Sequence, residues 1–199
     1  MTVSEKIDLY KLHKADYVAP KKPVLVKIAK AAYLSVPGEG PPGGEIFQER
    51  IGALYGMAFT IKMTRKFEGK GDYAVCKLEA QWFDTDRPQG EWRWRLLIRT
   101  PDFVGKSDLK SAAAKLEKKG KGDHVEKVAL EQISEGRCVQ MLHVGPYERE
   151  GETVAAMEQF VTEQGLTFHG AHHEIYLSDP RRVPPERLKT LLRRPVRRA

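Results

Sequence analysis

Short apolar stretches rich in β-branched and aromatic residues recur along the chain between polar segments, which is typical of β-strands. The stretches are residues 24–28, 32–36, 73–83, 92–99, 137–144, 172–177 and 188–196. Helical spacing of apolar residues occurs instead at 45–57, 107–119 and 150–164, and residues 125–132 are expected to start another short helix. In each half of the chain the order is therefore strand, helix, strand, strand.

The two halves repeat at a nearly constant distance along the sequence. Glu174 follows Glu79 by 95 positions and Pro195 follows Pro101 by 94, so the last two strands of each half align almost without gaps. We therefore expect two βαββ units related by a pseudo-twofold axis, within a single domain of 199 residues. Its expected divisions are a lead-in at 1–23, a first module at 24–104, a helical linker at 105–132 and a second module at 133–199.

A glutamate stands in the middle of one strand in each half, among apolar neighbours. Burying a carboxylate is costly unless another group pairs with it, so Glu79 and Glu174 are candidates for a shared polar cavity. Because side chains alternate along a strand, His172, Glu174 and Tyr176 share one face, and Ile175 is expected on the opposite, helix-covered face. Two alternatives stay open: Glu174 as a structural acid paired with an arginine or backbone amides, and Glu79 as a solvent-exposed residue.

Aromatic residues accompany both glutamates. The candidate ligand-binding residues are Glu79, Trp82, Phe83, Trp92, Trp94 and His172. Trp92 and Trp94 share one face of their strand and fit equally well as core residues. Tyr147 lies at a turn before a helix, where it can lean over the mouth of a cleft. An acid among aromatic rings suits a cationic or aromatic, hydrophobic small molecule.

The net charge of +7 comes from 34 basic and 27 acidic residues. Basic residues concentrate at 115–127 and 181–198, but aromatic residues do not interleave with them as a nucleic-acid stacking surface requires. We therefore interpret these stretches as a solvated helix face and a chain end, and expect no nucleic-acid binding. A protein partner with an acidic surface, docking on the basic tail, stays open.

Metal, redox and membrane chemistry are not expected. His172 and His173 point to opposite faces of a strand, and no third ligand stands at a convincing spacing, so no metal and no cofactor are predicted. Cys76 and Cys138 lie in apolar strands and are expected to be reduced core residues. No apolar run approaches the roughly 18 residues of a membrane span, and the N-terminus lacks the features of a signal peptide, so a cytoplasmic location is expected.

Four stretches together resemble the stand-alone GyrI-like small-molecule-binding proteins. They are KKPVLV at 21–26, the segment from FQE at 47–49 to LY at 54–55, EGRCVQMLHVGPY at 135–147 and HHEIYLSDP at 172–180. That family is similar in fold to the gyrase-inhibitor protein and to the effector domains of multidrug-sensing MerR- and AraC-type regulators. The resemblance implies an α+β fold in which two βαββ modules form a curved antiparallel sheet, with helices on one side and a ligand cleft on the other. No helix-turn-helix pattern precedes the module, so a stand-alone form is expected.

The resemblance also implies chemistry, since some stand-alone members are hydrolases that open the ring of cyclopropanoid DNA-alkylating compounds. Water would attack a ring carbon while the conjugated carbonyl oxygen gains a proton. The predicted catalytic residues are Glu174 as the base, and Tyr147 or Tyr176 as the hydroxyl that stabilises the oxyanion. Other members only bind ligands, so a non-catalytic sequestering protein and a gyrase-interacting protein are the alternatives.

Overall fold

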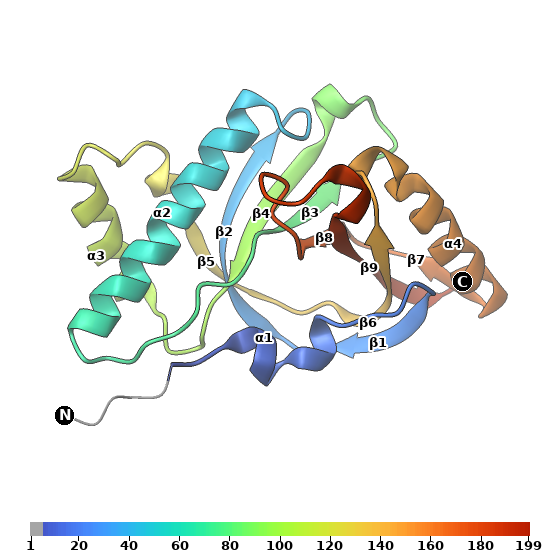
Figure 1. The fold of residues 1–199 in the computed structure, drawn as a ribbon, viewed down its shortest axis with the longest axis horizontal. Coiled ribbons are helices and arrows are strands. Elements are labelled where there is room, and N and C mark those ends of the chain that lie inside the picture. Colours follow the sequence, from blue (N-terminus) through green and yellow to red (C-terminus); the bar gives the residue numbers. More distant parts are fainter. Residues whose placement is uncertain (1–5) are drawn as a thin grey trace.

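The computed structural model describes residues 6–199 as a curved antiparallel sheet with helices packed against it (Figure 1). The strands are β1 Val24–Ile28, β2 Ala31–Glu39, β3 Glu79–Phe83, β4 Arg93–Arg99, β5 Ala129–Ile133, β6 Gly136–Val144, β7 Leu166–Phe168, β8 His172–Tyr176 and β9 Lys189–Arg198. The helices are α1 Leu9–Leu12, α2 Glu45–Phe67, α3 Lys106–Glu117 and α4 Glu150–Glu163. Single 3₁₀ turns lie at Lys14–Asp16, Gln89–Glu91, Val125–Lys127, Tyr147–Arg149 and Pro185–Arg187. No helix among residues 6–199 is both long and apolar enough to cross a bilayer.

The strand order shows the internal symmetry of the fold. It runs β1-β6-β9-β8-β3-β4-β2-β5, with β7 added to β9, so β3 and β8 meet antiparallel at the centre. On one side of this seam lie β4 and β2, and on the other lie β9 and β6. The modules β2-α2-β3-β4 and β6-α4-β8-β9 are thus arranged as the predicted pseudo-twofold, and the α+β fold is confirmed. The strand β1 extends the second module by pairing with β6, and β5 extends the first by pairing with β2.

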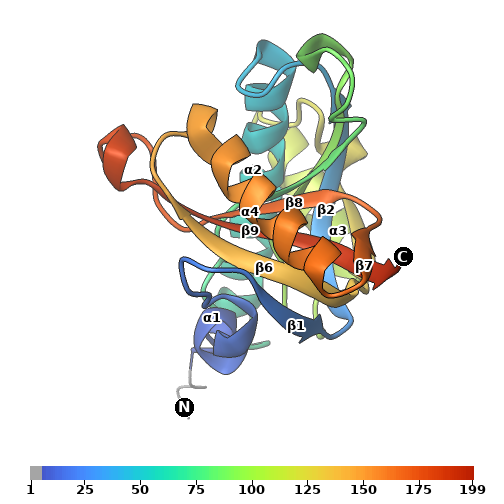
Figure 2. The same ribbon diagram turned by 90° about the vertical axis from the view of Figure 1, so that its right-hand side faces the viewer.

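The helices α2 and α4 cover the same face of the sheet, one over each module, and α3 packs against α2 (Figures 1 and 2). Leu54, Met57 and Ile61 of α2 are buried in the larger core, whereas Met157 and Val161 of α4 pack in a second core. The helix α2 runs ten residues past the predicted 45–57, so residues 59–63, which could either extend that helix or begin a connection, extend it. The helix ends before Gly69, whose φ of 68° suits glycine.

Two segments differ from the prediction. The strand expected at 73–83 is regular only from Glu79, although Tyr73 forms an isolated bridge with Ile7. The helix expected at 125–132 is wrong: a 3₁₀ turn leads into β5, which pairs along β2 from Ala31 to Ser35. The apolar spacing there is compatible with both structures, and pairing to an open sheet edge selects the strand. Cys76 and Cys138 are buried and free, as predicted.

The sheet face opposite α2 and α4 is covered by the N-terminal segment. Ile175 packs there with Tyr17, Ala19 and Leu191. The expectation that Ile175 faces the covering helices is therefore wrong. The helices instead cover the face that carries its neighbours His172 and Glu174, which makes that face the one where a site between the modules has to be sought.

A buried ionic network occupies the face under the N-terminal segment. His173 lies between Glu79 (3.0 Å) and Glu135 (2.9 Å), and Arg193 binds the other oxygen of Glu135 at 2.9 Å. The Tyr17 hydroxyl donates to Glu79 at 3.3 Å. Arg193 is 1% exposed, so this part of the basic tail is not the solvated chain end that was expected.

The protonation states of this network follow from its charges. Burial alone would lower the pKa of His173, but Glu135 and Glu79 outweigh it and raise that pKa to about 9. Burial alone would raise the pKa of Glu135, but His173 and Arg193 outweigh it and lower that pKa to about 2. His173 is therefore an imidazolium at neutral pH, held between carboxylates.

Candidate functional site

The candidate site lies at the seam between the modules, on the face that carries α2 and α4, and not on the helix-free side where the cleft was expected. The alternation along β8 turns His172, Glu174 and Tyr176 toward this face, as predicted. The Tyr176 hydroxyl donates to Oε2 of Glu174 at 2.7 Å, and His172 Nε2 lies 3.4 Å from Oε1. The Glu174 side chain is 14% exposed, so it is neither in bulk water nor sealed off.

A second carboxylate, Glu150, meets Glu174 at this point. It is the first residue of α4, is 8% exposed, and its Oε1 has no hydrogen-bond partner among residues 6–199. Burial, followed by the charge of Glu174, raises the pKa of Glu150 to about 9. Burial also acts to raise the pKa of Glu174, but hydrogen bonding to His172 and Tyr176 outweighs it and the pKa is lowered. These opposite shifts favour a single proton held by the pair at neutral pH, on the side of Glu150.

Aromatic rings surround this pair. Trp82 is stacked on Phe47 of α2, with ring centroids 5.5 Å apart. Trp92 meets Trp82 edge to face, with ring centroids 5.8 Å apart. The indole nitrogen of Trp82 approaches Glu174 and helps to lower its pKa, although it forms no regular hydrogen bond within the described chain. On the other side, Tyr147 packs edge to face against Tyr176, with ring centroids 5.9 Å apart, and Tyr147 is 37% exposed. Tyr147 is therefore the exposed ring of this group, and Trp82, which is 3% exposed, is a buried one.

Three of the predicted ligand-binding residues lie elsewhere. Trp94 is 2% exposed and donates its indole N–H to the carbonyl of Gly40, so it fills the core beside Phe47. Phe83 faces the opposite side of the sheet, where Arg95 lies over its ring. Glu79 is fully buried in the ionic network on that side, so the expectation that it lines the pocket or faces solvent is wrong.

The position of Glu79 has a simple geometric cause. In the central pair, Glu174 lies directly opposite Ala80, and Glu79 lies opposite Ile175. Residues directly opposite each other point to the same face, so the two glutamates point to opposite faces. The 95-residue alignment matches Glu174 with Glu79, whereas the residue that shares its face is Ala80, 94 positions earlier, and a shift of one residue is enough to reverse the face.

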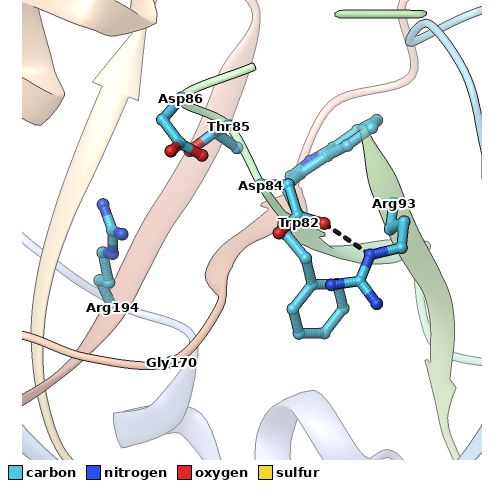
Figure 3. A pocket seen from close by; sticks show the side chains of 8 residues that line it. Trp82, Asp84, Thr85, Asp86, Arg93, Gly170 and Arg194 are labelled. Atoms are coloured by element: carbon cyan, nitrogen blue, oxygen red, sulfur yellow. Dashed lines mark hydrogen bonds and ion pairs between the residues drawn. The ribbon is translucent and has the colours of Figure 1, made fainter. Parts of the chain in front are cut away.

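A hollow of about 360 Å³ opens beside Trp82, at the end of β3 (Figure 3). Its lining includes Phe83, Asp84, Arg93 and Arg194, and Arg93 is paired with Asp84 at 2.5 Å. Trp82 borders both this hollow and Glu174.

The residue that sequence reasoning missed is Glu150. A glutamate in the first turn of a helix is ordinary, because the helix dipole favours it, so it gave no signal of its own. The available signal was its distance of three residues from Tyr147, which puts both near the same mouth. Together with His172 and Glu174, it forms a group whose nitrogen and oxygen donors all lie within 4.8 Å of one another.

Comparisons with known proteins agree with this architecture. The family model described as the GyrI-like small molecule binding domain matches residues 22–197. Among curated proteins, none matches the chain. A solved structure of an uncharacterized conserved protein from Listeria innocua is 40% identical, with a TM-score of 0.90, covering 96% of this chain and 100% of that one. A structure described as a hydrolase from Listeria innocua is 39% identical, with a TM-score of 0.88 and the same coverage.

A more distant structure shares the fold alone. The C-terminal domain of EcmrR is 12% identical, with a TM-score of 0.61, covering 89% of this chain and 98% of that domain. The family match spans both modules and the seam that carries Glu150 and Glu174. The chain belongs to the family of GyrI-like small-molecule-binding domains.

Proposed function

We propose that the protein binds flat, aromatic electrophiles at the seam and hydrolyses a cyclopropane ring conjugated to a carbonyl group, as a detoxifying enzyme. The single observation that carries the proposal is the grouping of Glu150, His172 and Glu174, whose donor atoms lie within 4.8 Å of one another beside Trp82. The similarity to a protein described as a hydrolase adds support. The hollow beside Trp82 suits a ligand longer than one ring system.

The proposed reaction adds one water molecule to the substrate. Glu174 accepts a proton from water as the water oxygen bonds to the ring CH₂ carbon. The C–C bond of the cyclopropane breaks, and its electron pair moves through the conjugated system to the carbonyl oxygen. That oxygen takes a proton from solvent, so the single product carries both an alcohol and a phenol or enol. Atoms and charge balance without a cofactor.

The roles of the tyrosines differ in this scheme. The Tyr176 hydroxyl is already donated to Glu174, so Tyr176 orients the base. Tyr147 is partly exposed at the mouth and its hydroxyl can face the carbonyl oxygen of a bound substrate. Glu150 keeps its proton throughout, and Glu174 returns to the ionised state by releasing to solvent the proton that it took from water.

Incubation with a spirocyclopropyl cyclohexadienone tests the proposal. Ring opening converts the dienone to a phenol, which changes the ultraviolet spectrum, and mass spectrometry identifies the water adduct. We expect wild-type turnover, and a loss of about 10²-fold or more in Glu174→Gln, because the base is removed. Glu148→Gln, at an exposed position two residues before Glu150, is the matched control and should keep wild-type rates.

A sequestering function is the alternative that the same experiment separates. An ionised Glu174 among aromatic rings also suits a cationic aromatic ligand. Saturable, stoichiometric binding without a water adduct would replace the hydrolase proposal with this one. Equal turnover by wild type and Glu174→Gln would remove Glu174 from the mechanism.

A further inference from the structure

We propose that Glu150, His172 and Glu174 form a binding site for a first-row divalent cation, with Zn²⁺ as the best fit. The three side chains come from two elements, the first turn of α4 and one face of β8, and their donor atoms lie within 4.8 Å of one another. Cation binding here does not require the protein to be a hydrolase, so it goes beyond the function proposed above.

The spacing of the donors is close to that of a coordination sphere. Zinc–nitrogen and zinc–oxygen bonds of about 2.0–2.2 Å put the ligands of a tetrahedral site about 3.4 Å apart. His172 Nε2 and Glu174 Oε1 are already 3.4 Å apart. The donor atoms of the three side chains all lie within 4.8 Å of one another, so small movements of the side chains would bring them to this spacing.

An unsatisfied buried atom points into this site. Glu150 is 8% exposed and its Oε1 has no hydrogen-bond partner in the described part of the chain. Buried acceptors are almost always paired, so this oxygen, beside a second carboxylate, calls for either a shared proton or a cation that displaces it. A divalent cation supplies a partner for that oxygen and neutralises both carboxylates together.

The surroundings of Glu174 match those of a metal-bound carboxylate. Its Oε2 accepts the Tyr176 hydroxyl at 2.7 Å, which leaves Oε1 turned toward His172. Carboxylate ligands are usually oriented by such a hydrogen bond. Two carboxylates and one imidazole form a nitrogen and oxygen donor set that suits Zn²⁺ and leaves a fourth position open, whereas Mg²⁺ prefers oxygen alone.

Metal binding to the chelator-treated, full-length protein tests the inference without any substrate. Isothermal titration and elemental analysis after dialysis should show about one Zn²⁺ per chain, with Mg²⁺ much weaker. Co²⁺ substituted into the wild type should give the visible absorption of a four-coordinate site. Absence of saturable Zn²⁺ binding, or a six-coordinate Co²⁺ spectrum, would overturn the inference.

Variants locate the site. Glu150→Gln and His172→Gln should each abolish the tight binding, and Tyr176→Phe should weaken it by about 10-fold or more, because it removes only the orienting hydrogen bond. Circular dichroism and the melting temperature check that each variant is folded. The control variants are Glu148→Gln and His124→Gln, the second because His124 lies 3.2 Å from Glu49 at the surface.

Loss of the tight site in His124→Gln, or its retention in both Glu150→Gln and His172→Gln, would place the cation elsewhere and refute the inference. The failure of the hydrolase proposal is a separate result. A protein that binds Zn²⁺ at these residues but forms no water adduct supports the cation site and refutes hydrolysis. Turnover by metal-free protein with no saturable Zn²⁺ binding does the reverse.

Discussion

The imidazolium of His173 makes a definite contribution to stability that depends on pH. Its pKa is about 9 in the folded protein, against 6.5 for an unperturbed histidine. Between these values the folded state holds a proton that the unfolded chain has lost. The stabilisation is therefore complete below pH 6.5 and disappears as the pH rises through 9. At about 1.4 kcal/mol per pKa unit, the difference corresponds to about 3 kcal/mol.

Replacing Glu135 by Gln tests this reasoning, because Glu135 contacts both His173 and Arg193. At pH 6, removal of one partner from a buried ionic network should cost about 3–5 kcal/mol. In the variant, only Glu79 remains to raise the pKa of His173, so the further loss of stability between pH 6.5 and 9 should shrink. Glu150 lowers stability over the same range in both proteins, and this contribution cancels in the comparison.

Urea unfolding followed by circular dichroism at pH 6, 7, 8 and 9 measures both effects. Glu131→Gln is the matched control: its partner Arg95 lies at 2.5 Å, but the two side chains are 35% and 27% exposed. That pair should contribute no more than about 1 kcal/mol, with an unchanged pH profile. A Glu135→Gln variant that loses less than the control, or whose profile runs parallel to the wild type, would refute the assigned charge of His173.

Three further outcomes are expected. Gly38→Ala should lower stability by about 3 kcal/mol in thermal unfolding, because its Cβ would lie 2.1 Å from the Trp94 ring; an unchanged melting temperature would contradict the packing. Trp82→Phe keeps an aromatic ring but removes the N–H near Glu174. Titration with the aromatic ligand proposed above should therefore show an affinity reduced about 10-fold, and an affinity equal to that of the wild type would exclude Trp82 from the site. Burial raises the pKa of Cys76 and Cys138 to about 12, so iodoacetamide at pH 8 should label neither until the protein is unfolded; labelling of the native protein would show that the strands open.

Much of the fold could be predicted because each module carries its own pattern. The strands β6 and β8 and the helix α4 follow directly from apolar spacing. The strand β5 could not be predicted in this way, because its spacing also fits a helix and only the open edge of β2 selects a strand. The partner of β1 was equally hidden, since a strand near the N-terminus gives no sign that it will pair with β6.

The site was predicted in part, and the limits have physical causes. Glu174, Tyr176 and His172 share a face because strands alternate, and this needs no tertiary information. The face that the helices cover does need such information, and so does the register of β3 against β8, which sends Glu79 to the other side. Glu150 became visible only when α4 was placed over the seam, because a carboxylate at a helix start is common.

Ala80, the smallest side chain along the seam, lies directly across from Glu174. The two modules have the same fold, but their central strands differ in chemistry. At this position β8 contributes a carboxylate, whereas β3 contributes only a methyl group. A ligand with one polar end and one apolar end would consequently bind in a single orientation. A symmetric ligand with two polar ends would find a carboxylate for only one of them.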